Sequence, residues 1–389
     1  MSSILREMRE YAYQFYSSQP LKYHVNKFLV YSGAQMSKYI PSKVQISVVN
    51  SSFGSPLRRL LYENFCGGKN ITEAVETANT YSSKNISSIL DYVSEGESNS
   101  SNSFDLNSID SALPFIERTP ENTMLSLKLS GIFGIECLKT LSQSIKIEKV
   151  EPERMLNGID REKYVYLLSR LSEIRAKKMY SIAVDAEWSD IQPAITFLAF
   201  ELMKKLNIEG PFVHNTYQAY LKDATDLYTA DIKQSISDGF HLGAKIVRGA
   251  YLRYEKSKDS NLVWDNIFET HASYDKCIRL SIELLKERKP SVILATHNEL
   301  SICKALEAST ANDSIFSYAQ LHGMRDFLTF FLANRSEVVY KYIPYGDEAE
   351  SIPYLIRRVD ENSGAFDSLQ FERKIIQKEL FRRIFLNRQ

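Results

Sequence analysis

Near the end of the chain, an aromatic ring, two arginines and a carboxylate recur at helical spacing. We expect residues 347–362 to form a helix on which Tyr354, Arg357, Arg358 and Glu361 share one face, at i, i+3, i+4 and i+7. Two adjacent guanidinium groups can bind the carboxylate of a small molecule through paired hydrogen bonds. The alternative is a solvent-exposed helix with an Arg357–Glu361 ion pair, the commoner arrangement for a helix considered alone.

Polar side chains also gather near the carboxyl ends of short β-rich runs. They are Lys128, Asp185, Glu187, Gln218, Lys245, Arg248, Tyr251, Thr296, His297, Asn298, Gln320, His322 and Tyr342. Because every buried polar group needs a partner, so many at similar depth favour a functional site over a hydrated interior.

Two kinds of chemistry are compatible with this set. The first is a metal site in a lyase or hydrolase, made of Asp185, Glu187, His297 and His322. However, Lys128, Lys245 and the two arginines would repel a metal ion. They suit instead an anionic organic cofactor together with a carboxylate substrate. We therefore expect no bound metal.

Eight β-rich runs would position these side chains. They cover residues 86–93, 125–132, 181–187, 212–220, 244–252, 292–298, 315–322 and 338–345. Helical spacing occupies most intervals, at residues 162–178, 191–206, 221–237, 265–286 and 300–308. Alternating strands and helices predict parallel βα units, and eight of them predict a closed (β/α)8 barrel with its site at the carboxyl ends of the strands. The alternative, an open doubly wound sheet, lacks a glycine fingerprint after an early strand.

The expected division is a helical N-terminal arm over residues 1–80 and a catalytic barrel over residues 81–389. The Ser- and Asn-rich residues 94–107 predict a surface loop, and residues 367–387 predict a last, charged helix.

Composition indicates a soluble globular protein. Lys+Arg and Asp+Glu number 48 each, so no basic surplus points to nucleic acid. Four scattered cysteines indicate reduced thiols in an intracellular compartment. No run approaches the roughly 18 apolar residues of a membrane span, and the N-terminus shows no clear presequence. Residues 11–48 could form helices on the barrel or on a membrane surface.

Eight motifs in order resemble the proline dehydrogenase family, in its monofunctional mitochondrial form. They read LSLKLSG, IAVDAEWSDIQPAI, NTYQAYLKD, GAKIVRGAYL, ATHNE, AQLHGM, YKYIPYG and PYLIRRVDEN. The resemblance implies a distorted (β/α)8 TIM-type barrel that binds FAD, with a C-terminal helix over the active site. It also implies oxidation of L-proline to Δ1-pyrroline-5-carboxylate, a quinone acceptor, and peripheral placement on the matrix side of the mitochondrial inner membrane.

On the substrate side, the resemblance implies a catalytic set of Lys128, Asp185, Tyr251, Tyr342, Tyr354, Arg357 and Arg358. Arg357 and Arg358 would grip the proline carboxylate with Lys128, and Tyr342 and Tyr354 would close over the ring.

On the cofactor side, it implies contacts from Asp185, Ala186, Gln218, Lys245, Val247, Arg248, Gly249, Ala250, Thr270, Thr296, His297, Asn298, Gln320, Leu321 and Glu361. Lys245 would lie near flavin N5 and Gln218 at the pyrimidine edge.

Tyr342 also bears on the substrate. Relatives that prefer hydroxyproline have a serine at this position, and a tyrosine leaves little room for a 4-hydroxyl group. We therefore expect L-proline to be preferred over trans-4-hydroxy-L-proline. A hydroxyproline dehydrogenase and, further off, a metal-dependent barrel lyase are the alternatives.

Overall fold

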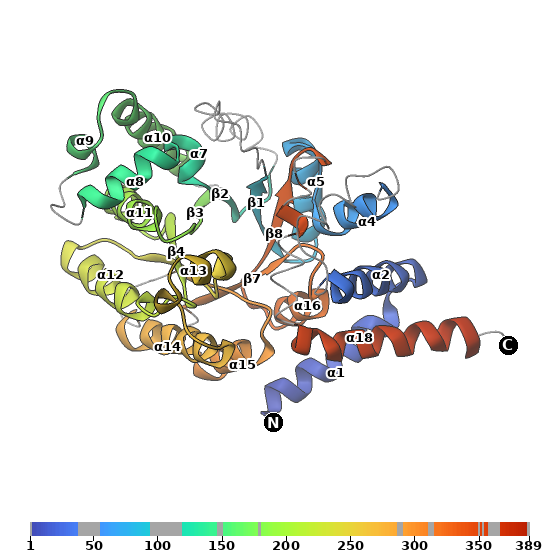
Figure 1. Ribbon diagram of the computed structural model, residues 1–389. Coiled ribbons are helices and arrows are strands. Elements are labelled where there is room, and N and C mark those ends of the chain that lie inside the picture. The colour runs from blue at the N-terminus through green and yellow to red at the C-terminus, as the bar shows by residue number, and fades with distance from the viewer. Residues whose placement is uncertain are drawn as a thin grey trace.

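Eight parallel strands close into a barrel in which each strand pairs with its neighbours in chain order (Figure 1). The computed structural model describes residues 2–37, 55–93, 119–145, 151–177, 180–285, 291–309, 315–348, 351, 354–356 and 366–386. The strands are β1 (Ser87–Tyr92), β2 (Thr123–Leu127), β3 (Tyr180–Val184), β4 (Val213–Gln218), β5 (Gly243–Val247), β6 (Ser291–Ala295), β7 (Phe316–Leu321) and β8 (Val339–Tyr345). The predicted barrel is confirmed.

Helices surround the strands. They are α7 (Leu129–Phe133), α8 (Ile135–Ser144), α9 (Pro152–Met155), α10 (Gly158–Ala176), α11 (Gln192–Leu206), α12 (Ala224–Asp238), α13 (Leu252–Lys258), α14 (Ile267–Leu285), α15 (Glu299–Ala308) and α16 (Asp326–Asn334). The five predicted helices between strands are confirmed with small shifts of their ends.

Side chains alternate between two layers along the strands. A small apolar cluster inside the barrel contains Ile89 and Ile293, with Tyr340 and Tyr342 packed against it. The larger core fills the space between strands and helices. Because successive residues of a strand face opposite sides, Lys341 points away from the interior that Tyr342 faces.

Two strands, β2 and β5, end five residues earlier than predicted. The run at residues 125–132 leaves the sheet after β2, because buried residues from Leu129 onward have helical spacing and form α7. The run at residues 244–252 leaves it after β5. There Gly249 has a φ of +122°, and a Cβ would overlap the Tyr220 ring. Lys128 therefore lies just beyond β2, and Arg248 and Tyr251 lie beyond β5, whereas Lys245 lies within β5.

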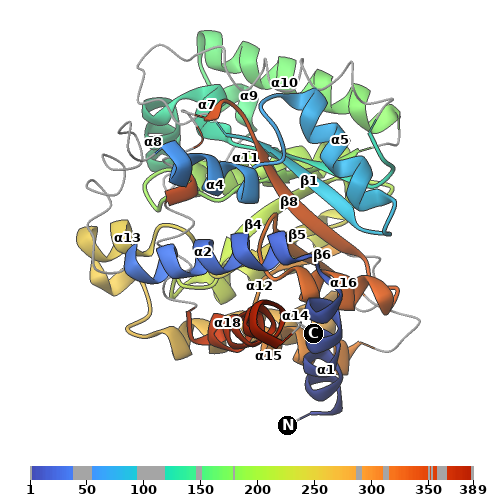
Figure 2. The ribbon, with the colours of Figure 1, turned by 90° about the vertical axis from the view of Figure 1, so that its right-hand side faces the viewer.

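The N-terminal region is helical where it is described, in α1 (Ser3–Ser18), α2 (Leu21–Ser37), α4 (Ser55–Phe65) and α5 (Ile71–Ser82). The predicted last helix is confirmed as α18 (Phe366–Phe381), followed by a π turn (Arg382–Leu386). Figures 1 and 2 show α1, α2 and α18 together beside α16.

A buried carboxylate joins these terminal helices. Glu372 of α18 accepts hydrogen bonds from the hydroxyl groups of Tyr16 in α1 and Tyr31 in α2. In contrast, α5 packs against β1 and β8 in the outer layer of the barrel. The division at residue 80 stays a prediction. The predicted loop at residues 94–107 and most of the predicted helix at residues 347–362 lie outside the described residues.

Candidate active site

Asp185 is the centre of a polar cluster at the carboxyl ends of the strands. Its carboxylate follows β3 and accepts hydrogen bonds from Ser126 Oγ of β2 at 2.7 Å and from Tyr342 Oη of β8 at 2.8 Å. Lys245 of β5 donates to its other oxygen, and Lys128 Nζ lies 3.7 Å away. The structure thus brings together four residues that the sequence placed on four different strands.

Asp91 was missed by the sequence reasoning, although it completes this cluster. It lies near the end of β1, is 1% exposed, and binds the Lys128 ammonium through Oδ1. Its Oδ2 is buried and has no hydrogen-bond partner among the residues that the structure describes. A carboxylate within the apolar run at residues 86–93 was the available signal, because the other strands carry their polar residues at the same level.

The two carboxylates are in different electrostatic states. Burial alone would raise the pKa of Asp185, but Lys245 and Lys128 outweigh it and hold that pKa well below its usual range. Burial raises the pKa of Asp91, and Asp185 adds to this while Lys128 opposes it. Burial and then Asp185 raise the pKa of Tyr342, so its hydroxyl stays protonated and donates. The cluster therefore holds one firmly ionised carboxylate and one that binds a proton more readily.

Arg248 organises a second region beyond β5. Its guanidinium donates to His271 Nδ1 at 2.9 Å, Thr296 Oγ1 at 2.6 Å and Ser301 Oγ at 3.0 Å. It also lies 4.4 Å from the centroid of the Tyr274 ring. Burial lowers the pKa of Arg248. All three acceptors are neutral, which leaves a half-buried cation suited to an anionic group.

The ends of β6 and β7 are joined by a neutral histidine. His297 Nε2 accepts a hydrogen bond from the Leu321 amide at 3.1 Å. Burial, and then Lys341, lower the pKa of His297 to about 3. Gln320 donates to the Thr296 carbonyl at 3.3 Å. These contacts fix the backbone on which the predicted cofactor contacts lie.

Other predicted cofactor residues have structural partners of their own. Gln218 is buried and donates to the Glu187 carbonyl at 2.8 Å. Asn298 caps α15 by accepting from the Ser301 amide at 3.1 Å. Thr270 is buried in the first turn of α14. Ala186, Val247, Gly249 and Ala250 lie at the ends of β3 and β5 or just after them.

The remaining predicted substrate residues are only partly visible. The Tyr251 ring lies 5.8 Å from that of Trp188, measured between centroids. Tyr354 is buried and close enough to Tyr342 to raise its pKa. Arg357, Arg358 and Glu361 lie outside the described residues, so the anion clamp stays a prediction.

The alternative metal set is dispersed. Glu187 accepts from the Ser130 amide at 3.2 Å, His297 binds the Leu321 amide, and His322 contacts Tyr81 Oη at 2.9 Å. Within the described ranges, no three His, Cys, Asp or Glu side chains are grouped so as to hold a metal ion.

Sequence comparison finds known relatives of this chain. The human protein "Proline dehydrogenase 1, mitochondrial" is 36% identical over 256 residues, which cover 63% of this chain and 41% of that protein. Rat hydroxyproline dehydrogenase is 32% identical over 298 residues, covering 68% of this chain and 65% of that protein. The chain thus spans about two fifths of the human relative's length.

Solved structures share the fold. Proline utilization A from Bdellovibrio bacteriovorus, inactivated by N-propargylglycine, superposes with a TM-score of 0.65 at 16% identity, covering 92% of this chain and 38% of that one. No described helix combines the length and apolar character needed to cross a bilayer.

The sequence profile of the family named Proline dehydrogenase matches residues 74–370. The chain belongs to the proline dehydrogenase family.

Proposed function

We propose that this chain oxidises L-proline to Δ1-pyrroline-5-carboxylate with FAD as cofactor and passes the electrons to a quinone. The observation that carries the proposal is the Asp91–Lys128–Asp185–Lys245–Tyr342 cluster at the carboxyl ends of five strands. Membership of the family and the human relative support the choice of proline.

The residues around Arg248 fit an anionic dinucleotide. A half-buried guanidinium with only neutral hydrogen-bond acceptors suits the phosphates of FAD, and Thr296 and His271 orient it. Lys245 lies in β5, three residues before Arg248, and would place a cation beside the flavin ring system. When bound, FAD supplies the acceptor for the hydride that leaves C5 of proline.

The side chains of the cluster would bind and orient the substrate. Lys128 and the two arginines would hold its carboxylate, and Tyr342, fixed by its bond to Asp185, would pack against the ring. The substrate nitrogen must lose a proton before C5 is oxidised. Asp91 Oδ2, buried and unused by the described residues, would accept a hydrogen bond from that nitrogen and hold the released proton.

A second candidate is oxidation of hydroxyproline, because the rat hydroxyproline dehydrogenase is similar over much of the chain. Tyr342 argues against it. Its hydroxyl is fixed by Asp185 and Ser126 Oγ, the latter at 3.1 Å, so the ring has little freedom to move aside for a 4-hydroxyl group.

Steady-state oxidation of both substrates with a soluble quinone tests the proposal. We expect kcat/KM for L-proline to exceed that for trans-4-hydroxy-L-proline by about tenfold or more, as a steric clash of 1–2 kcal/mol would produce. Equal or better turnover of the hydroxylated substrate would reject proline as the preferred one. By analogy with the human relative's name, we also propose a mitochondrial location with peripheral membrane contact.

A further inference from the structure

A cavity lies outside the barrel, where the N-terminal helices meet it. It measures about 480 Å³ and is lined by Phe15, Gln19, Tyr23, Thr77, Thr80, Tyr81, Lys84, His322, Asp326 and Phe330. Apart from His322, which follows β7, these residues belong to or flank α1, α2, α5 and α16. None of them belongs to the Asp185 cluster. The volume is in the usual range for small-molecule sites, roughly 300–1,000 Å³.

The walls of this cavity are aromatic. Phe15 of α1 and Phe330 of α16 stack with their centroids 5.3 Å apart and their planes at 28°. Tyr23 and Tyr81 add two more rings. These four rings come from α1, α2, α5 and α16. They favour a flat ligand, because ring faces pack best against other planar systems.

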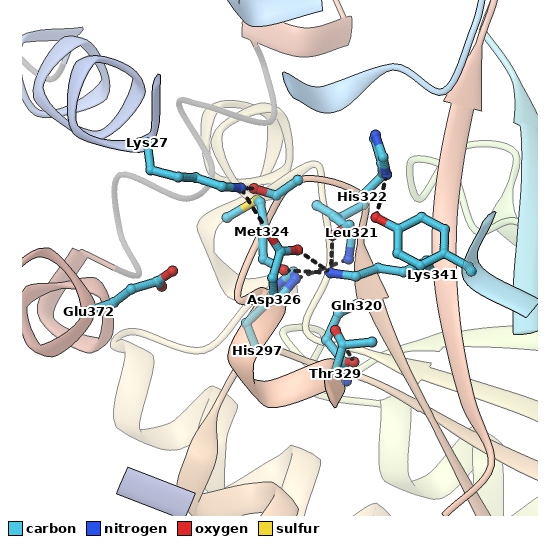
Figure 3. Close-up of polar contacts among 12 residues, drawn as sticks. Lys27, His297, Gln320, Leu321, His322, Met324, Asp326, Thr329, Lys341 and Glu372 are labelled. Atoms are coloured by element: carbon cyan, nitrogen blue, oxygen red, sulfur yellow. Dashed lines mark hydrogen bonds and ion pairs between the residues drawn. The ribbon is translucent and has the colours of Figure 1, made fainter. Parts of the chain in front are cut away.

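The carboxylate of the cavity is already fully used. Asp326 binds Lys341 Nζ at 3.0 Å and Lys27 Nζ at 3.1 Å (Figure 3). It also accepts a hydrogen bond from Tyr23 Oη at 2.9 Å. Lys27 and Lys341, in turn, hold the charge of Asp326 by lowering its pKa well below the usual range, although burial acts in the opposite direction. Asp326 therefore has little capacity left to bind a cationic ligand.

The unused polar groups are hydrogen-bond donors. Tyr81 Oη lies 2.9 Å from His322 Nδ1, and either atom can be the donor in this bond. In the tautomer in which Tyr81 donates, the second ring nitrogen of His322 carries the proton. Lys84 Nζ lies 5.4 Å from the centroid of the Phe330 ring, and within the described residues no carboxylate pairs with it. The hydroxyl groups of Thr77 and Thr80, in contrast, donate hydrogen bonds to backbone carbonyls.

We propose that this cavity binds a flat ring compound carrying a carboxylate or carbonyl oxygen. The ring would lie among Phe15, Tyr23, Tyr81 and Phe330, and the oxygen would accept hydrogen bonds from His322 and Lys84. The site is separate from the Asp185 cluster, and its occupation requires the N-terminal helices α1 and α2 to be docked.

Calorimetric titration of the purified chain tests this with 2-naphthoate and its uncharged analogue 2-naphthamide. We expect one site for each. Lys84→Gln should weaken naphthoate binding about five- to tenfold and leave naphthamide binding within about twofold, because only the carboxylate gains from the ammonium charge. His322→Leu should weaken both about fivefold. Lys69→Gln, which changes an exposed lysine outside the cavity at the other end of α5, should weaken neither.

Two results would overturn the proposal. One is the absence of saturable binding of both compounds. The other is binding that neither Lys84→Gln nor His322→Leu weakens, which would place the compounds elsewhere. Because His322→Leu could perturb folding, Tyr81→Phe provides a smaller change in the same contact, with an expected loss of about threefold for both compounds. Circular dichroism verifies that each variant is folded.

Discussion

Tyr342 and Lys341 are neighbours on β8, yet they belong to two polar clusters on opposite sides of the barrel wall. Tyr342 lies in the inner cluster, with Asp185, Asp91, Lys128 and Lys245. Lys341 lies in the outer cluster, where its ammonium donates to Leu321 O at 3.1 Å, Met324 O at 2.8 Å and Asp326 at 3.0 Å (Figure 3).

The two clusters differ in how many of their polar atoms have hydrogen-bond partners. An ammonium has three donors, and Lys341 places all three on protein acceptors. The inner cluster instead leaves Asp91 Oδ2 buried without a partner among the described residues. A satisfied network stabilises a fixed geometry, here the turn between β7 and α16, whereas an unused buried acceptor remains available to a substrate group.

The largest expected effect is on catalysis, from the inner cluster. Asp185→Asn removes the charge that orients Lys245 and Tyr342, and we expect kcat/KM for L-proline to fall about 10³-fold, or about 4 kcal/mol. Activity should be expressed per folded molecule. A loss smaller than about tenfold would show that Asp185 is not central to the site.

The next effect is on stability, from the outer cluster. Lys341→Met leaves Asp326 with one fewer cation and two backbone carbonyls without a donor, so we expect the free energy of unfolding to fall by about 3 kcal/mol in urea denaturation. The kcat/KM of the folded fraction should change less than about threefold, and Lys341→Arg should recover part of the stability. A large loss of turnover in folded Lys341→Met would contradict the separation of the two clusters.

Lowering the pH should destabilise the folded chain through His297 and His322, the two histidines next to the outer cluster. Burial, and then Lys341, lower the pKa of His297 to about 3 and that of His322 to about 4, from an ordinary value of 6.5. Below about pH 6.5, these histidines bind protons in the unfolded chain but not in the folded chain, so the free energy of unfolding falls as the pH falls. We expect these two histidines together to contribute about 2 kcal/mol to the loss between pH 6.5 and 5.5.

His322→Leu sharpens this test. It removes one of these groups, so the loss over the same interval should be about 1 kcal/mol smaller in equilibrium denaturation. A pH dependence that is identical in this variant would mean that the fold does not hold His322 in its neutral form.

The smallest effect comes from a single hydroxyl group. Tyr342→Phe removes the hydrogen bond to Asp185, and we expect kcat/KM for proline to fall about tenfold. Tyr340→Phe is the matched control, since Tyr340 packs in the same interior cluster but has no hydrogen bond to Asp185. Equal losses in both variants would attribute the effect to ring packing alone.

The barrel was predictable because its evidence is local. The alternation of β-rich runs and helical spacing is written in short segments, and the residues just after β3 and within β5 and β8 could be assigned to one end of the barrel. Asp91 was missed because it lies within an apolar run, where one carboxylate does not stand out. Predicted strand ends shifted where α7 begins and where Gly249 turns the chain.

The outer cluster could not have been predicted from spacing. Lys27 and Asp326 are about 300 residues apart, and only the docking of α2 against α16 brings them together. The cavity beside them depends on the same docking. A sequence shows that a buried charge is unusual, but its partner is set by tertiary packing.

The most direct test of the central claim is the absorption spectrum of the purified protein, recorded without oxygen before and after L-proline is added. We predict the visible absorption band of a bound flavin, and its loss when L-proline is added to the native chain, with a loss about 10³-fold slower in Asp185→Asn. A colourless protein that cannot be reconstituted with FAD, or a flavin band that L-proline leaves unchanged, would contradict the account.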